Sequence, residues 1–172
     1  MFDKEYSFRG IHAKRVNQLT AKFNDSSKLF DRNFDVYLVA PIIGFLYGRK
    51  SGLDVSTDET TKIFPDMLIR NNEDLMFNYR LIMLLDKAYE PDLDKRIDKA
   101  FRLFGKAESK PDEEIYESYV RGGVDVLYEK LIQNANNPDD YLANLYDFLE
   151  EFDERYNVNA DGIADLCRLA RS

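Results

Sequence analysis

Apolar residues recur every three or four positions over most of the chain, which is the spacing that gathers them on one face of an α-helix. Alternation of the kind that marks strands is scarce. The pattern predicts a brief helix opened by Pro65 and longer helices over about residues 7–23, 35–47, 73–89, 92–104, 111–134, 138–155 and 160–169. The sequence therefore predicts an all-α fold of about six to eight helices, and its length most simply accommodates a single compact domain, residues 1–172.

Two helices are expected at the centre of this domain. The segment from Val36 to Tyr47 carries no charged residue. As a helix it spans only about 18 Å, against roughly 30 Å of membrane hydrocarbon, so it is too short to cross a membrane. It should instead be buried, with Ile43 and Leu46 in the core. The helix at 73–89 is apolar over most of its circumference and should be central too.

Pro41 leaves the structure of this apolar segment open. Inside a helix it removes one hydrogen bond and crowds the carbonyl of Tyr37, which costs about 3 kcal/mol. One alternative is a helix that begins near Asp35 and is kinked at Pro41. The other is a short extended segment at 36–39, after which Pro41 opens the helix at its first position. We favour the first alternative.

Small residues occupy notable positions in two of the predicted helices. Gly122 and Gly123 lie in the middle of the helix at 111–134, where they cost about 2 kcal/mol relative to alanines. They indicate either close packing against another backbone or a break between two helices. Ala40 and Gly44 are four residues apart and share one helix face, so a second helix could approach them closely. These four residues are the candidates for helix packing.

The charge distribution bears on nucleic-acid binding. A net charge of −8 argues against generic binding to phosphates. However, residues 1–50 hold nine Lys and Arg against five Asp and Glu, whereas residues 51–172 hold fifteen against twenty-seven. This asymmetry permits a local basic face on an acidic protein. The candidate nucleic-acid-binding residues are Lys14, Arg15, Lys22, Arg32, Arg49 and Lys50.

Other candidate chemistry is weak. The stretch 157–168 has the spacing of a calcium-binding loop, but its twelfth position, where a bidentate Glu is needed, is Arg168. We interpret it as a turn in which Asp161 caps the last helix. His12 and Cys167 are single representatives of their types, and no spacing brings them together. His12 is expected at the surface or its boundary, and Cys167 in the core.

Reactive motifs and targeting signals give no stronger indication. The clustered carboxylates fall at helix starts or on faces expected to be solvated, and the sequence shows neither a phosphate-binding loop nor a serine elbow. We therefore predict no catalytic residue, no metal and no cofactor. The single cysteine excludes an intramolecular disulfide, and the charged start is unlike a secretory signal, which together predict a cytoplasmic protein without a membrane anchor.

Two segments resemble a known family. The stretch "NFDVYLVAPIIGFLYGRKSGLD" and the later "IYESYVRGGVDVLYEKL" resemble segments of small bacterial accessory proteins encoded with DNA phosphorothioation (Dnd-type) and related phage-defence systems. The matching positions are Ala40, Gly44, Gly48, Arg49, Tyr119, Gly122 and Gly123. The resemblance covers about forty residues, and residues 132–172 have no counterpart in it. It implies an accessory or adaptor role and no reaction.

Three functional hypotheses follow. The first is a non-catalytic interaction protein, with another protein as its partner, in a bacterial DNA-modification or phage-defence system. The second is a protein that binds nucleic acid directly through the basic N-terminal face. The third is a helical enzyme whose site is assembled from residues far apart in the sequence. The sequence leaves the oligomeric state open.

Overall fold

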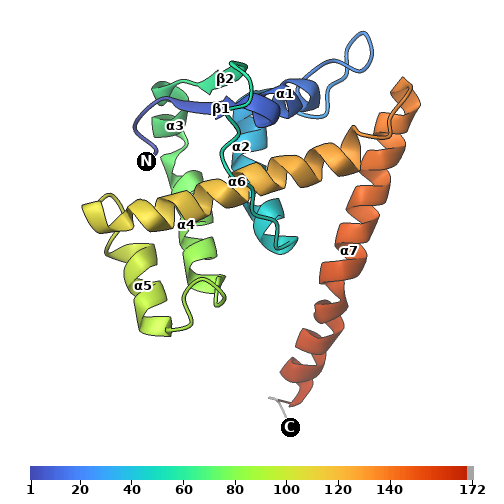
Figure 1. Cartoon of the computed structure of the whole chain (residues 1–172). Helices are drawn as coiled ribbons and strands as arrows, with labels where there is room; N and C mark the ends of the chain where they lie inside the picture. Colours follow the sequence, from blue (N-terminus) through green and yellow to red (C-terminus); the bar gives the residue numbers. More distant parts are fainter. Residues whose placement is uncertain (170–172) are drawn as a thin grey trace.

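The computed structural model describes the backbone of residues 1–169 and the side chains of residues 1–155 (Figure 1). About 62% of the chain is helical, which confirms the predicted all-α fold class apart from one small sheet. The elements are β1 (Tyr6–Arg9), α1 (Gly10–Leu19), α2 (Asn33–Leu46), β2 (Thr60–Ile63), α3 (Pro65–Arg70), α4 (Asn72–Leu85), α5 (Leu93–Phe101), a 3-10 turn (Ala107–Ser109), α6 (Lys110–Leu131) and α7 (Pro138–Leu169).

The core is built around the crossing of α2 and α6 (Figure 1). The predicted buried segment is indeed one helix, and Pro41 lies inside it and is buried. The extended alternative for 36–39 is therefore wrong. Ile43 is 5% exposed, as expected, whereas Leu46 is only half-buried. Packing of α2 on several neighbours offsets the hydrogen bond that Pro41 removes.

At the crossing the two helix backbones touch through glycines. A Cβ atom placed on Gly123 would lie 1.7 Å from the carbonyl oxygen of Ala40, and one on Gly44 would lie 2.1 Å from that of Tyr119. Both distances are far below van der Waals contact, so a larger residue at either position would push the helices apart. The helix α6 runs without a break through Gly122 and Gly123. The glycine pair thus serves close packing.

The beginning of the chain differs from the sequence prediction. Residues 7–9, expected in the first helix, belong to β1, which pairs with β2 in an antiparallel register that sets Tyr6 opposite Ile63. Gly10 adopts a left-handed φ of 57°, which turns the chain from the strand into α1. The backbone N–H of Ile11 then donates to Asp54 at 2.6 Å, so a residue remote in sequence caps this helix. The helix ends at Leu19, before the predicted end at residue 23.

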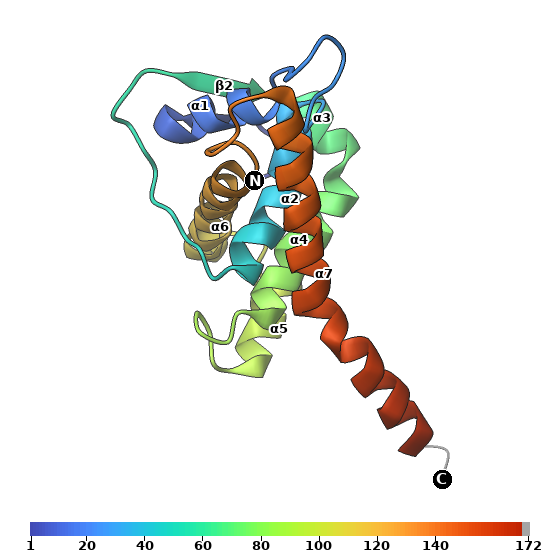
Figure 2. The same cartoon turned by 90° about the vertical axis from the view of Figure 1, so that its right-hand side faces the viewer.

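The end of the chain also differs. The predicted helices at 138–155 and 160–169 form the single helix α7, and the expected turn near 157–160 is wrong. No proline follows Pro138, and one glycine inside a helix costs only about 1 kcal/mol, so no strong local signal stops the helix. In Figure 2 the last part of α7 extends beyond the other helices. The role of Cys167 and the ligands of the calcium-like stretch lie outside the described side chains.

Candidate interaction surface

The predicted nucleic-acid-binding cations are mostly paired with carboxylates. Four of them form ion pairs, namely Arg15, Arg32, Arg49 and Lys50. Their partners are, in the same order, Asp125, Asp35, Glu129 and Asp86. The last three pairs have nitrogen-to-oxygen distances of 2.7, 3.0 and 3.3 Å. A phosphate would have to compete with these carboxylates for the same cations.

The six cations are also not gathered in one place. Arg32 precedes α2 and Arg49 follows it, so they lie at opposite ends of a helix about 21 Å long. Lys22 donates to the carbonyl oxygen of Asp25 at 3.2 Å. Lys14 is exposed, and it forms no ion pair with another described residue. Arg32 and Arg49 therefore do not belong to one compact basic face.

Arg15 belongs to a buried polar junction that also contains His12. Nε2 of His12 lies 3.2 Å from Asp125, and Ser51 donates to the same carboxylate. His12 is 4% exposed, so the expected surface position is wrong. Burial acts to raise the pKa of Asp125, but the hydrogen bonds from His12 and Ser51 and the charge of Arg15 bring it below its usual value. The junction links the loop after α2 to α1 and α6.

Glu117 is a half-buried acid that lies where β1 and α2 meet α6. Tyr37 donates to Oε1 of Glu117 at 3.2 Å, and Oε2 of Glu117 is inaccessible to solvent and has no partner among the described residues. Burial raises the pKa of Glu117 to about 7, although hydrogen bonds from Tyr6 and Tyr37 act against this rise. Such a group can exchange a proton near neutral pH. It lines neither of the grooves described next.

An exposed, mainly apolar surface is centred on α4, and we call it the docking face. It combines two grooves, of about 620 Å³ between α4 and α5 and about 420 Å³ among α2, α4 and α7. Phe77 lines both grooves and is 64% exposed, so its ring forms a ridge between them. The apolar residues of the docking face are Leu38, Val39, Ile42, Ile43, Met76, Phe77, Leu81, Leu84, Phe101 and Phe152, of which Ile43 and Met76 are buried in its floor.

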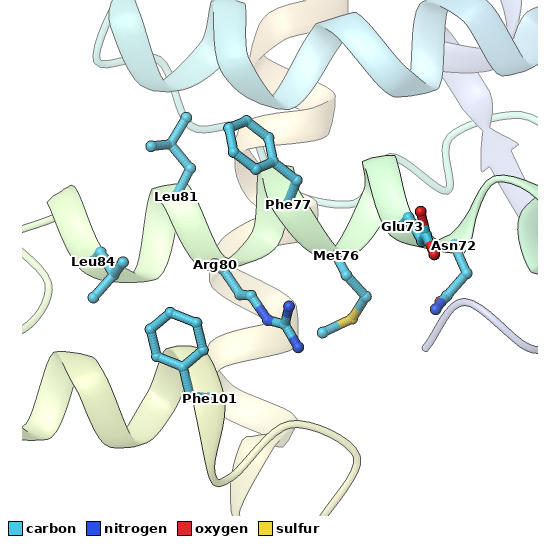
Figure 3. A pocket seen from close by; sticks show the side chains of 8 residues that line it. All are labelled: Asn72, Glu73, Met76, Phe77, Arg80, Leu81, Leu84 and Phe101. Atoms are coloured by element: carbon cyan, nitrogen blue, oxygen red, sulfur yellow. The ribbon is translucent and has the colours of Figure 1, made fainter.

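The pattern of α4 explains why this surface exists. Leu75, Tyr79 and Ile82 face the core and are fully buried. Phe77 and Leu81, four residues apart, point away from α5 in Figure 3. The prediction that this helix is central is thus correct for its inner side and wrong for its outer side. The core covers only one side of a helix, so a helix that is apolar over most of its circumference leaves apolar side chains exposed on its other side. This surplus of apolar residues is the signal in the sequence that could have predicted an interaction surface on α4.

The docking face has fixed walls and a charged rim. The side chain of Asn78 donates to the carbonyl oxygen of Leu38 at 2.8 Å and holds α4 against α2. Arg80 points toward Phe101 of α5, and its guanidinium lies 5.4 Å from the ring centre (Figure 3). Glu73 and Asp74 lie in the first turn of α4 and form no ion pair with another described residue. The face therefore has an acidic end and a cation near its middle.

Other kinds of site find no support in the described part of the chain. Among the described residues no three His, Cys, Asp or Glu side chains are grouped closely enough to hold a metal ion. Within the same residues no helix is both long and apolar enough to cross a membrane. No family model, no curated protein and no solved structure matches this chain. The docking face is the feature from which a function can be argued.

Proposed function

We propose that this protein is a non-catalytic interaction protein that binds another protein through the docking face. The observation that carries the proposal is the exposed ring of Phe77 between two apolar grooves. A large aromatic side chain in water is unfavourable unless a partner covers it, and buried aromatic residues dominate the binding energy of many interfaces. Contiguous apolar surface with a polar rim is typical of protein–protein contact sites.

The same structure gives less support to the other two hypotheses. Direct DNA binding would rely on cations that mostly face carboxylates of this chain. Catalysis would need a reactive group at a groove, and Glu117 lies away from both. The accessory role is also what the family resemblance implies. A place in a DNA-modification or phage-defence system stays a prediction, and the identity of the neighbouring genes would test it.

Site-specific photo-crosslinking in the cells of origin tests the proposal. A benzophenone amino acid replaces Phe77 in one variant and Tyr146 in the other. Tyr146 is the matched control because it is aromatic, is 66% exposed and lies outside the docking face. We expect a crosslinked protein from position 77 and little or none from position 146. Equal crosslinking from both positions, or none from position 77, would contradict the proposal.

Duplex DNA binding provides the second arm of this test. At about 0.15 M salt we expect the wild-type protein to show no measurable affinity for a duplex. If the cations do contact phosphates, the logarithm of affinity falls by about 0.9 per contact for each tenfold rise in salt. The double variant Lys14→Glu, Arg49→Glu would then lose binding while keeping its fold, because both residues are exposed. Tight, salt-sensitive binding that this variant abolishes would favour the nucleic-acid hypothesis.

A further inference from the structure

The walls of the docking face restrict what can bind there. Both grooves are lined by side chains of helices, whose backbone N–H and C=O groups bond within each helix except in its first and last turns. Within the described residues that line them, the grooves therefore offer a partner no strand edge to pair with. An extended segment buried in them would leave its own backbone groups without hydrogen bonds, which costs several kcal/mol. A helix satisfies its backbone internally and avoids that cost.

The ridge and the grooves suit a helix with apolar residues at helical spacing. Side chains three or four residues apart on a helix lie about 5–6 Å from each other on one face. A helix lying across Phe77 can place one such side chain in the groove against Phe101 and the next in the groove against Phe152. The ring of Phe77 would then pack between them. This is the arrangement by which amphipathic helices bind grooves in other proteins.

The rim charges add a requirement on the partner's charge. Asp74 lines the groove among α2, α4 and α7, and the described residues that line this groove include no Lys or Arg. Glu73 lies beside it at the same end of α4, and Arg80 follows about 10 Å along the helix axis. A Lys or Arg at one end of the bound helix would face Glu73 and Asp74. Such complementarity sets the direction of binding more than it raises affinity.

We infer that the docking face binds an amphipathic helix of a partner protein, with apolar residues at i, i+3 or i+4, and i+7, and with a Lys or Arg at the end that meets Glu73 and Asp74. This inference rests on the proposed interaction function and specifies the class of partner. A second copy of this chain, contributing a helix such as α7, is the competing occupant.

Selection from a displayed library of random 16-residue peptides tests the inference without a known partner. The library is selected against the wild-type protein and counter-selected against Phe77→Asp. We expect enriched peptides with the apolar spacing above and a terminal Lys or Arg. A synthetic consensus peptide should become helical on binding. Its Kd should rise at least tenfold for Phe77→Asp, rise by a smaller factor, about threefold, for the double variant Glu73→Lys, Asp74→Lys, and change less than twofold for the control Tyr146→Asp.

The outcomes separate this inference from the proposed function. Circular dichroism and melting of each variant check that the fold is intact. We expect it to be, because all the substituted residues are exposed. The inference would be overturned if no peptide is enriched, or if the enriched peptides lack the helical spacing of apolar residues. It would also be overturned if Phe77→Asp leaves the affinity for the peptide unchanged. If position 77 still crosslinks to another protein in cells, the interaction function stands and only the helical partner is wrong. A crosslink between two copies of this chain would overturn the inference in favour of self-association.

Discussion

The helices α2 and α4 are each 14 residues long and both are rich in apolar side chains, yet those side chains make different contacts. Where α2 crosses α6, alanine and glycines let the two backbones meet, and no space is left for a ligand. On the outer side of α4, Phe77 projects into solvent between two grooves. Apolar character alone therefore does not separate a core helix from an interface helix. The size of the residues at the contact decides whether the surfaces close or leave grooves.

The largest expected effect comes from enlarging a residue at the crossing. In Gly123→Ala the new methyl group would meet the carbonyl oxygen of Ala40, and neither backbone can move without disturbing the core. We expect the free energy of unfolding, measured in urea, to fall by about 3 kcal/mol or more. The control is Gly52→Ala, because a Cβ at Gly52 meets no atom within 4 Å. An equally stable Gly123→Ala protein would show that the helices are not in close contact.

Truncating one apolar residue in each helix compares the two regions directly. Ile43→Ala removes a buried side chain and leaves a cavity, so we expect a loss of about 2–5 kcal/mol. Phe77→Ala removes a larger but exposed side chain and should change the stability of the isolated protein by less than about 1 kcal/mol. Melting of both variants by calorimetry measures the difference. Comparable losses would place Phe77 inside the core and remove the basis for the docking face.

The buried half of the molecule should also respond to pH. The pKa of Glu117 rises from 4.5 to about 7 on folding, so the folded protein holds this proton more tightly than the unfolded chain. The associated stability is present below pH 4.5 and is lost as the pH rises to about 7, to an extent of about 3 kcal/mol at most. In Glu117→Gln this loss should disappear, and the variant should be more stable than wild type at pH 8. Urea unfolding at pH 5 and pH 8 measures the change. An unaltered pH dependence in the variant would mean that Glu117 stays ionised in the fold.

Local signals in the sequence were sufficient for most of the helices. Apolar spacing predicted α2 and α4, Pro65 predicted the start of α3, and a helix was predicted from about residue 92. There the side chain of Asp92 accepts a hydrogen bond from the backbone N–H of Lys95 at the start of α5. These signals act within about one helical turn, so neighbouring residues determine them. The sequence also predicted that the uncharged segment containing Ile43 is buried, because so much apolar surface is unfavourable in water.

Tertiary contacts decided the rest. The four-residue strand β1 depends on pairing with β2 more than fifty residues later, and α1 begins where Asp54 caps it. Whether Gly123 marked a break or a contact depended on Ala40, and whether the cations were available for phosphates depended on carboxylates such as Asp125 and Asp86. Likewise, the pattern of α4 cannot tell which of its apolar sides the core covers. All of these features depend on residues that are distant in sequence and adjacent only in the fold, beyond the reach of local periodicity.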